Sequence, residues 1–355
     1  MRLTDVFSAQ SVALNRTEVE SNRIPFLGEA WFPNRKKMGI DLSWIKAHKG
    51  LGVALKPSNF DTLATIRGRQ GIAMTKQQMP LFREGMTVKE QDMIDIMRVS
   101  ESNDPYINAV LSSIYDDTNT LIDGADIAVE RMRMQLLCPV NGELNISIAT
   151  DDVIYNYDYD SDGSWKAKHY VELTTAGDKW NAPTTSKPLT NLRAGIQYLA
   201  SIGVTATTIL SNSSTFDLLL ESDQVKNALV TMSGTTVNFM DTETTEEVIR
   251  RKLKVDWMTY DKMYKDYDES EKKFYLDDYV TIIGSGQLGS TWFGTTPEER
   301  TLLTDPKVDV SVLDRGTAIA VKTDYGPPVL TSTYVSQIVL PSFEGMDSIS
   351  VLKVK

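Results

Sequence analysis

The chain has 355 residues, a net charge of −11, 41% hydrophobic residues and 24% charged residues. These values exclude wholesale disorder, and no apolar run reaches the roughly 18–20 residues that a transmembrane helix needs, so no membrane partner is expected. The single cysteine, Cys138, excludes an intrachain disulfide and a zinc site built on several cysteines. We expect about two domains and a reducing, cytoplasmic place of synthesis.

The charge is unevenly distributed along the chain. Residues 1–90 hold 14 Lys and Arg against 8 Asp and Glu, whereas the remainder holds 23 against 40. So acidic a chain is a poor candidate for a tight, sequence-independent nucleic-acid binder. The basic N-terminal quarter, with its step Arg35-Lys36-Lys37, needs a separate explanation.

The first 90 residues predict extended structure with little core of its own. Residues 1–50 have no sustained period and are interpreted as an extended arm, with one helical turn near 42–48. Residues 51–90 alternate apolar and polar side chains in two arms, which predicts a long hairpin with Arg67 and Arg69 near its tip. Such a projection is stable only if another surface holds it.

Residues 105–137 predict one long helix. Asn103-Asp104-Pro105 is a helix start signal, apolar residues recur every three or four positions from Ile107 to Leu136, and Pro139 ends the pattern. Cys138, beside this end, is expected to be a buried small hydrophobic residue.

The rest of the chain predicts an α/β block between two β-rich segments. We expect a linker over 178–188 and helices over 191–202, 214–220 and 246–253. Strands are expected over 144–148, 153–157, 169–173, 205–210, 255–260, 274–276, 279–283, 318–323, 333–340 and 349–354. The acidic segment 261–271 is interpreted as a solvated turn or face. This order suggests a domain inserted between two halves of a β domain.

A glycine motif offers one alternative function. Gly284, Gly286 and Gly289 match G-x-G-x-x-G after an apolar strand, which suggests a nucleotide-dependent oxidoreductase that binds a dinucleotide. That chemistry needs a helix directly after the glycines, whose N-terminal amides hold the pyrophosphate. The residues that follow, up to Pro297, are poor helix formers, so an ordinary glycine loop is the simpler interpretation.

An acidic loop offers a weak metal candidate. Asp158, Asp160 and Asp162 precede Gly163 with the spacing of the first half of a calcium loop. The twelfth position, however, is His169 where a bidentate glutamate belongs. No motif of nucleophilic or metal-dependent catalysis accompanies it, so we expect no catalytic residue, no cofactor and no resident metal, and a solvated turn at 158–162.

Several stretches carry a family resemblance. They are Pro33-Asn-Arg-Lys-Lys-Met-Gly-Ile-Asp-Leu-Ser-Trp-Ile-Lys46, Gly50-Leu-Gly-Val-Ala-Leu-Lys-Pro-Ser-Asn-Phe-Asp61, Met79-Pro-Leu-Phe-Arg-Glu84 and Leu288-Gly-Ser-Thr-Trp-Phe-Gly-Thr-Thr-Pro-Glu298. The chain resembles the major capsid protein E family of lambda-like tailed bacteriophages, which is similar to the Hong Kong 97-type capsid fold.

The resemblance implies an α+β fold with a fixed order of parts. It implies an N-terminal arm over 1–50 and an extended E-loop hairpin over 51–88. A peripheral domain over 89–186 would contain a spine helix at 105–137, an α/β axial domain would occupy 187–315, and return strands of the peripheral domain would occupy 316–355.

The implied function is mechanical and not enzymatic. A major capsid protein self-assembles through hexamers and pentamers into an icosahedral shell around double-stranded DNA, in the cytoplasm of a bacterial host, and ends in the virion capsid. Implied partners are other copies of the chain, a separate scaffold protein, a portal, a possible decoration protein, and DNA held without sequence specificity. A non-viral cargo shell of the same fold is the alternative.

The candidate inter-subunit residues lie in the arm and the hairpin. They are Arg35, Lys36, Lys37, Val53, Leu55, Ile66, Arg67, Arg69 and Phe82. We expect the basic residues to meet an acidic face of a neighbouring copy, because complementary charge fixes register across interfaces.

Overall fold

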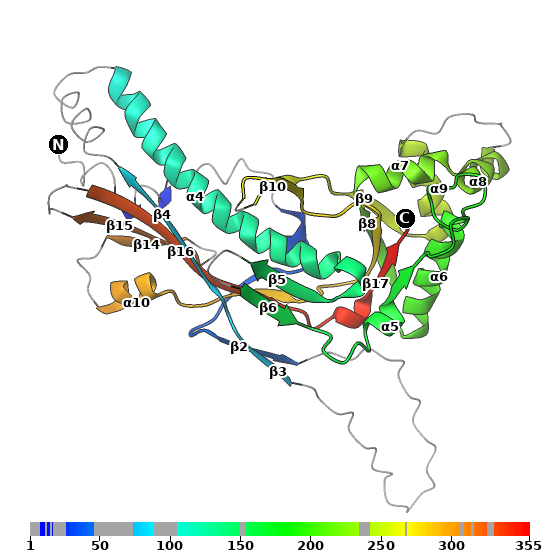
Figure 1. The fold of residues 1–355 in the computed structure, drawn as a ribbon, viewed down its shortest axis with the longest axis horizontal. Helices are drawn as coiled ribbons and strands as arrows, with labels where there is room; N and C mark the ends of the chain where they lie inside the picture. The colour runs from blue at the N-terminus through cyan, green and yellow to red at the C-terminus, as the bar shows by residue number, and fades with distance from the viewer. Residues whose placement is uncertain are drawn as a thin grey trace, which may run out of the picture. The chain divides into compact units, whose positions relative to one another are not determined.

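The structure is a computed structural model that describes residues 8–10, 13–14, 16, 26–45, 74–88, 105–149, 154–233, 242–266, 268–304, 309–313, 316–324 and 330–355. The chain forms two compact units. The first unit comprises Met1–Leu42, Lys76–Met132 and Ser290–Ser342, and the second comprises Ser43–Thr75, Arg133–Gly289 and Phe343–Lys355. Figure 1 shows the described elements in their chain order.

The first unit is built on a six-stranded sheet. β13 (Ser290–Phe293) is parallel to β1 (Asn34–Lys36) and antiparallel to the long β16 (Leu330–Ser342). β16 also pairs with β15 (Ala318–Asp324) and β4 (Leu81–Val88), and β14 (Val310–Val312) pairs with β15. The α10 helix (Pro297–Thr304) follows β13. Residues 81–88 of the predicted hairpin are therefore a strand of this sheet.

The helix α4 (Pro105–Leu137) has the predicted bounds. In the first unit, Leu121 and Ile122 of α4 pack with Ile319 and Val335 of the sheet, and Gln337 Nε2 donates to Ala125 O at 2.8 Å. These contacts explain the apolar stripe, because one face of the helix covers a sheet.

Residues of the predicted arm dock against the first unit. The Nη2 atom of buried Arg16 lies 2.8 Å from Asp123 Oδ1 and 2.9 Å from Asp126 Oδ2, both on α4. The Ala9 amide donates to the Asp309 carboxylate at 3.0 Å. Residues 9–10, 13–14 and 16 are helical, so the prediction of an extended arm is wrong at these positions.

The second unit is built on a five-stranded sheet in the order β7-β17-β12-β8-β9. β12 (Tyr279–Gly284) runs antiparallel to β8 (Ala206–Ser211) and to β17 (Ile349–Lys353). β9 (Asp256–Thr259) and β7 (Tyr170–Glu172) form the edges. The predicted strands at 318–323, 333–340 and 349–354 are thus divided between two sheets.

Helices gather beside this second sheet (Figure 1). They are α6 (Pro188–Ser201), α7 (Ser213–Glu221), α8 (Asp223–Ser233) and α9 (Thr242–Leu253). Their core includes Trp180, Leu192, Phe216, Trp257 and Ile282. Both this helix-covered sheet and the α4-covered sheet bear out the predicted mixture of helix and sheet.

Smaller elements complete the described chain. They are η1 (Leu27–Ala30), β2 (Asp41–Ile45), β3 (Met74–Gln78), η2 (Val140–Gly142), β5 (Asn145–Ala149), β6 (Ile154–Asp158), α5 (Lys166–His169), β10 (Met263–Lys265), β11 (Glu271–Lys273) and η3 (Met346–Ser348). Separate two-stranded sheets join β2 to β3, β5 to β6 and β10 to β11.

Three local predictions are wrong. The helical turn expected near 42–48 is strand β2 over its described part, and Pro188, expected in a linker, begins α6 because proline suits a first helical position. The strand expected over 274–276 is absent there: Phe274 and Tyr275 turn inward to the core. By contrast, the described residues of the acidic segment 261–271 are exposed or half-buried, as a solvated face requires, and they include β10 and the start of β11.

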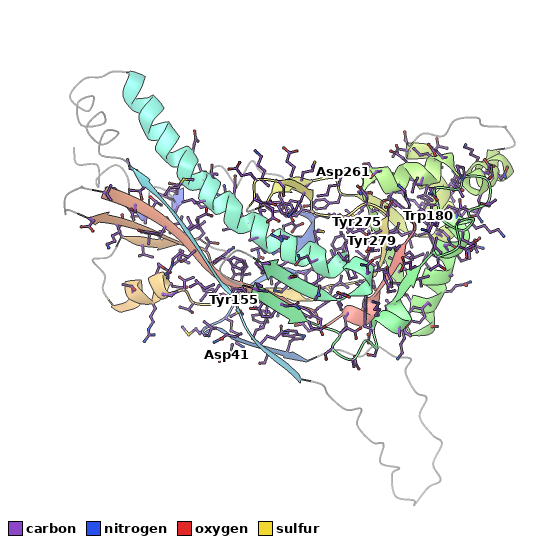
Figure 2. The ribbon with its side chains drawn as sticks, viewed as in Figure 1. Asp41, Tyr155, Trp180, Asp261, Tyr275 and Tyr279 are labelled. Atoms are coloured by element: carbon purple, nitrogen blue, oxygen red, sulfur yellow. The ribbon has the colours of Figure 1, made fainter. Side chains whose placement is uncertain are left out.

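A buried network of hydrogen bonds lies at the C-terminal end of α4 in the second unit. Thr281 Oγ1 donates to Leu137 O at 2.6 Å and lies 2.8 Å from Tyr275 Oη. The Asn141 amide donates to Tyr279 Oη at 3.0 Å. Tyr275 and Tyr279 are labelled in Figure 2.

Cys138 is buried, as predicted, and burial raises the pKa of its thiol to about 12, so it is an inert core residue.

Candidate assembly surface

The basic step is anchored in the sheet of the first unit. Arg35 lies opposite Trp292 in the β1–β13 pairing, and its guanidinium carbon lies 5.8 Å from the centre of a Trp292 ring. Lys37 Nζ donates to Asp41 O at 2.9 Å. Arg35 remains exposed, so this strand presents a positive charge on a firmly held backbone.

Lys36 and Arg83 meet two consecutive glutamates at the start of α10. Lys36 Nζ lies 2.7 Å from Glu299 Oε2, and Arg83 Nη2 lies 2.5 Å from Glu298 Oε1. Ser336 Oγ donates to Glu298 Oε2 at 2.6 Å. We call Lys36, Arg83, Glu298, Glu299 and Ser336 the acidic clamp.

The local sequence explains why Glu298 and Glu299 lie in the first turn of α10. Thr296 is fully buried and its Oγ1 accepts the Glu299 amide at 3.2 Å, and Pro297 begins the helix. A threonine followed three residues later by glutamate, with proline between, is a recognised helix-start pattern. Sequence reasoning missed this pattern and the pairing of Glu298 with Arg83, which depends on strand placement.

The other predicted inter-subunit residues are only partly described. Phe82 is half-buried on β4, opposite Gln337 of β16, and Leu81 and Met86 of the same strand are exposed. Val53, Leu55, Ile66, Arg67 and Arg69 lie outside the described residues. The structure therefore brings the basic step near α10 and places Phe82 in the same sheet.

The glycine loop leads into a strand. Gly284 ends β12, and β13 begins at Ser290, so no helix follows the motif directly. A Cβ on Gly284 would lie 2.4 Å from Val204 Cγ1 and 3.0 Å from Ser348 O. This glycine thus permits close packing, and the arrangement lacks the helix N-terminus that a pyrophosphate needs.

The aspartates of the acidic loop hold a turn that leads into α5. Asp158 Oδ1 accepts the Asp160 amide at 2.9 Å, and the two oxygens of Asp160 accept the amides of Trp165 and Lys166 at 2.9 and 2.8 Å. Hydrogen bonds from Ser164 lower the pKa of Asp162. These carboxylates satisfy backbone donors, as Asx-turn residues do.

His169 lies inside the second unit. Its Nδ1 lies 2.8 Å from Ile349 O and must donate, because a carbonyl only accepts. Its Nε2 lies 3.3 Å from Tyr198 Oη and 3.7 Å from Asp347 Oδ1, and the ring stacks on Trp165 at 5.6 Å between centroids. Burial lowers its pKa from 6.5.

The described part of the chain shows neither a metal-binding cluster nor a membrane-spanning helix. Among these residues, no group of three or more His, Cys, Asp or Glu side chains is arranged to hold a metal ion. No helix among them is long and apolar enough to cross a membrane.

Comparison with known sequences identifies the family. A sequence model described as phage major capsid protein E matches residues 10–315. The chain belongs to the phage major capsid protein E family. The predicted family is confirmed, and because its members are structural capsid proteins and not enzymes, the oxidoreductase alternative does not apply. No curated protein matches the sequence.

Solved structures show the same fold. A putative capsid protein of a prophage from E. coli CFT073 matches with a TM-score of 0.61 and 13% identity, over 98% of this chain and 99% of that one. A phage-related protein from Bordetella bronchiseptica RB50 matches with a TM-score of 0.56 and 12% identity, over 98% and 97%. The capsid asymmetric unit of cyanophage A-1(L) matches with a TM-score of 0.50 and 12% identity, over 93% and 92%. The predicted capsid fold class is thereby confirmed.

Proposed function

We propose that copies of this phage capsid protein assemble through hexamers and pentamers into an icosahedral shell that encloses the double-stranded DNA of a tailed phage or prophage. The observation that carries the proposal is the family match over residues 10–315. A fold match that covers 98% of this chain and 99% of a prophage capsid protein supports it.

The inter-subunit contacts are assigned to the arm and the hairpin. In the basic step, Arg35 is exposed on β1, whereas Lys36 pairs with Glu299 and Lys37 donates to Asp41 O of the same chain, so Arg35 is the residue placed best for a contact with a neighbour. Because neighbouring copies in rings meet through different faces, a basic strand of one copy can bind an acidic face of the next. The hairpin residues Val53, Leu55, Ile66 and Phe82, with Arg67 and Arg69, are proposed to lie on that neighbour.

The charge of the chain agrees with a container for DNA. An acidic shell does not hold the packaged genome tightly, since tight non-specific binding needs many lysine and arginine contacts to phosphates. As the family resemblance implies, we also propose a separate scaffold protein, a portal and a decoration protein as partners. Assembly would take place in the bacterial cytoplasm, and the mature protein would lie in the virion capsid.

Negative-stain electron microscopy tests the function. The full chain is purified alone and after co-expression with the genes that neighbour it. Closed shells, or uniform hexamers and pentamers, are expected; a discrete monomer or dimer under both conditions would overturn the proposal. Nuclease-protected DNA in shells made during infection is also expected, whereas DNA-free shells with other cargo would support the cargo-shell alternative.

A further inference from the structure

Segments that are distant in the sequence converge at the acidic clamp. Lys36 lies on β1, Arg83 on β4, and Glu298 and Glu299 open α10, all within the first unit. The approach is close: a Cβ on Gly294 would lie 2.7 Å from Gly39 O and 2.9 Å from Met79 Cε. The three stretches that carry much of the family resemblance, at 33–46, 79–84 and 288–298, therefore meet here.

The clamp holds both ends of one chain segment. Lys36 is the last residue of β1 and Arg83 is the third residue of β4, so they bracket residues 37–82. That segment contains β2 and β3, which pair with each other, and most of the predicted hairpin. Because Glu298 and Glu299 are consecutive, their Cα atoms are about 3.8 Å apart, and both ends are tied to nearly the same point.

The two ion pairs of the acidic clamp are partly exposed, as is typical of contacts that can break and re-form without unfolding the chain. Lys36 and Arg83 are 39% and 44% exposed, whereas Glu299 and Glu298 are 21% and 16% exposed. The glutamates are held in place, Glu298 by Ser336 and Glu299 by the helix start. Partly exposed ion pairs contribute little to folding and weaken in salt. Backbone pairing already holds β1 against β13 and β4 against β16.

We propose that the acidic clamp sets the direction in which segment 37–82 leaves the sheet of the first unit, and thereby where the predicted hairpin meets a neighbouring copy. In this proposal Glu298 and Glu299 are positioning residues for assembly. The first role of Lys36 is its ion pair with Glu299 of the same chain, and a contact of Lys36 with a neighbouring copy is secondary. The inference rests on the proposed function, because direction matters only if the segment contacts another copy.

Charge reversal and reciprocal exchange test the proposal. Lys36→Glu and Arg83→Glu are each expected to lower the yield of closed particles at least several-fold while free capsid subunits accumulate. The exchanged pairs, Lys36→Glu with Glu299→Lys and Arg83→Glu with Glu298→Arg, are expected to restore most of the yield. Arg250→Glu is the matched control, since it removes the exposed Arg250–Asp256 pair of the second unit.

The outcomes separate this inference from the proposed function. If the natural chain forms no shells, the proposed function fails; if it does and both single reversals assemble like it, only the clamp proposal fails. The proposal is also overturned if a reversal unfolds the free subunit by circular dichroism, or if exchange does not restore assembly of folded chains. Raised NaCl should lower particle yield for the natural chain more than for Glu298→Gln/Glu299→Gln.

Discussion

Gly294 lies where two backbone segments of the first unit approach each other closely. A Cβ there would lie 2.7 Å from Gly39 O and 2.8 Å from Ile338 Cγ2, so backbone as well as a side chain would have to move. Overpacking of this kind costs about 1–3 kcal/mol, and we expect Gly294→Ala to lower the free energy of unfolding by that amount. Denaturant unfolding measures the change.

Gly124 supplies the matched control. It lies inside α4, and a Cβ at this position would meet nothing within 4 Å. Gly124→Ala should raise the free energy of unfolding by about 0.5–1 kcal/mol, because alanine favours helix interiors. If Gly294→Ala does not lower the free energy of unfolding relative to Gly124→Ala, the packing at Gly294 is not tight.

His169 predicts a pH dependence of stability. Burial lowers its pKa below the ordinary 6.5, and Asp347 at 3.7 Å only partly offsets this. The unfolded chain therefore takes up the proton more readily, so the stabilisation is complete above about pH 6.5 and is lost as the pH falls through the folded-state pKa.

Melting temperatures between pH 8 and pH 5 measure this effect. His169→Asn keeps a donor for Ile349 O but has no proton to gain, so its melting temperature should fall less on acidification than that of the natural chain. A parallel fall in both proteins would assign the acid sensitivity to other groups. His48 is present in both and cancels.

At the scale of elements, α4 is the longest helix in the described part of the chain. Ile114 lies in its interior, and proline there removes a backbone hydrogen bond and clashes with the preceding turn, at a cost of about 3 kcal/mol or more. We expect Ile114→Pro to abolish folding of the subunit, as seen by circular dichroism. Asp116→Ala, at an exposed position of the same helix, should leave folding intact; an assembly-competent Ile114→Pro protein would refute the role of α4.

Elements also differ in how well local sequence predicted them. The bounds of α4 follow from Pro105, the apolar stripe and Pro139, which act within a few residues. The prediction of a strand at 274–276 is wrong because Phe274 and Tyr275 are buried as single side chains outside any strand. The Phe274 ring packs on the Tyr264 ring with 4.7 Å between their centroids, and Tyr275 Oη donates a hydrogen bond to Leu210 O. An apolar run reports burial, but it does not report which element is buried.

At the scale of the whole molecule, the predicted hairpin should matter for assembly more than for folding. Deletion of residues 58–72 is expected to leave the helices and sheet of the second unit folded and to block closure of shells. Electron microscopy and circular dichroism of the same preparation measure the two effects. Replacement of these residues by an equally long Gly/Ser sequence separates the length of the hairpin from its side chains. Normal particles from the deletion would show that the hairpin is wrongly assigned.

The sequence by itself determined the family, the mixed α+β class, the long helix and the burial of Cys138. These follow from motifs and periodicities that are complete within short stretches. Only the tertiary structure decided that β17 joins β12 and β7, that residues 81–88 pair with β16, and that Lys36 and Arg83 meet adjacent glutamates. Such pairings join residues far apart in the chain, and local propensity carries no information about which distant strand or charge will be the partner.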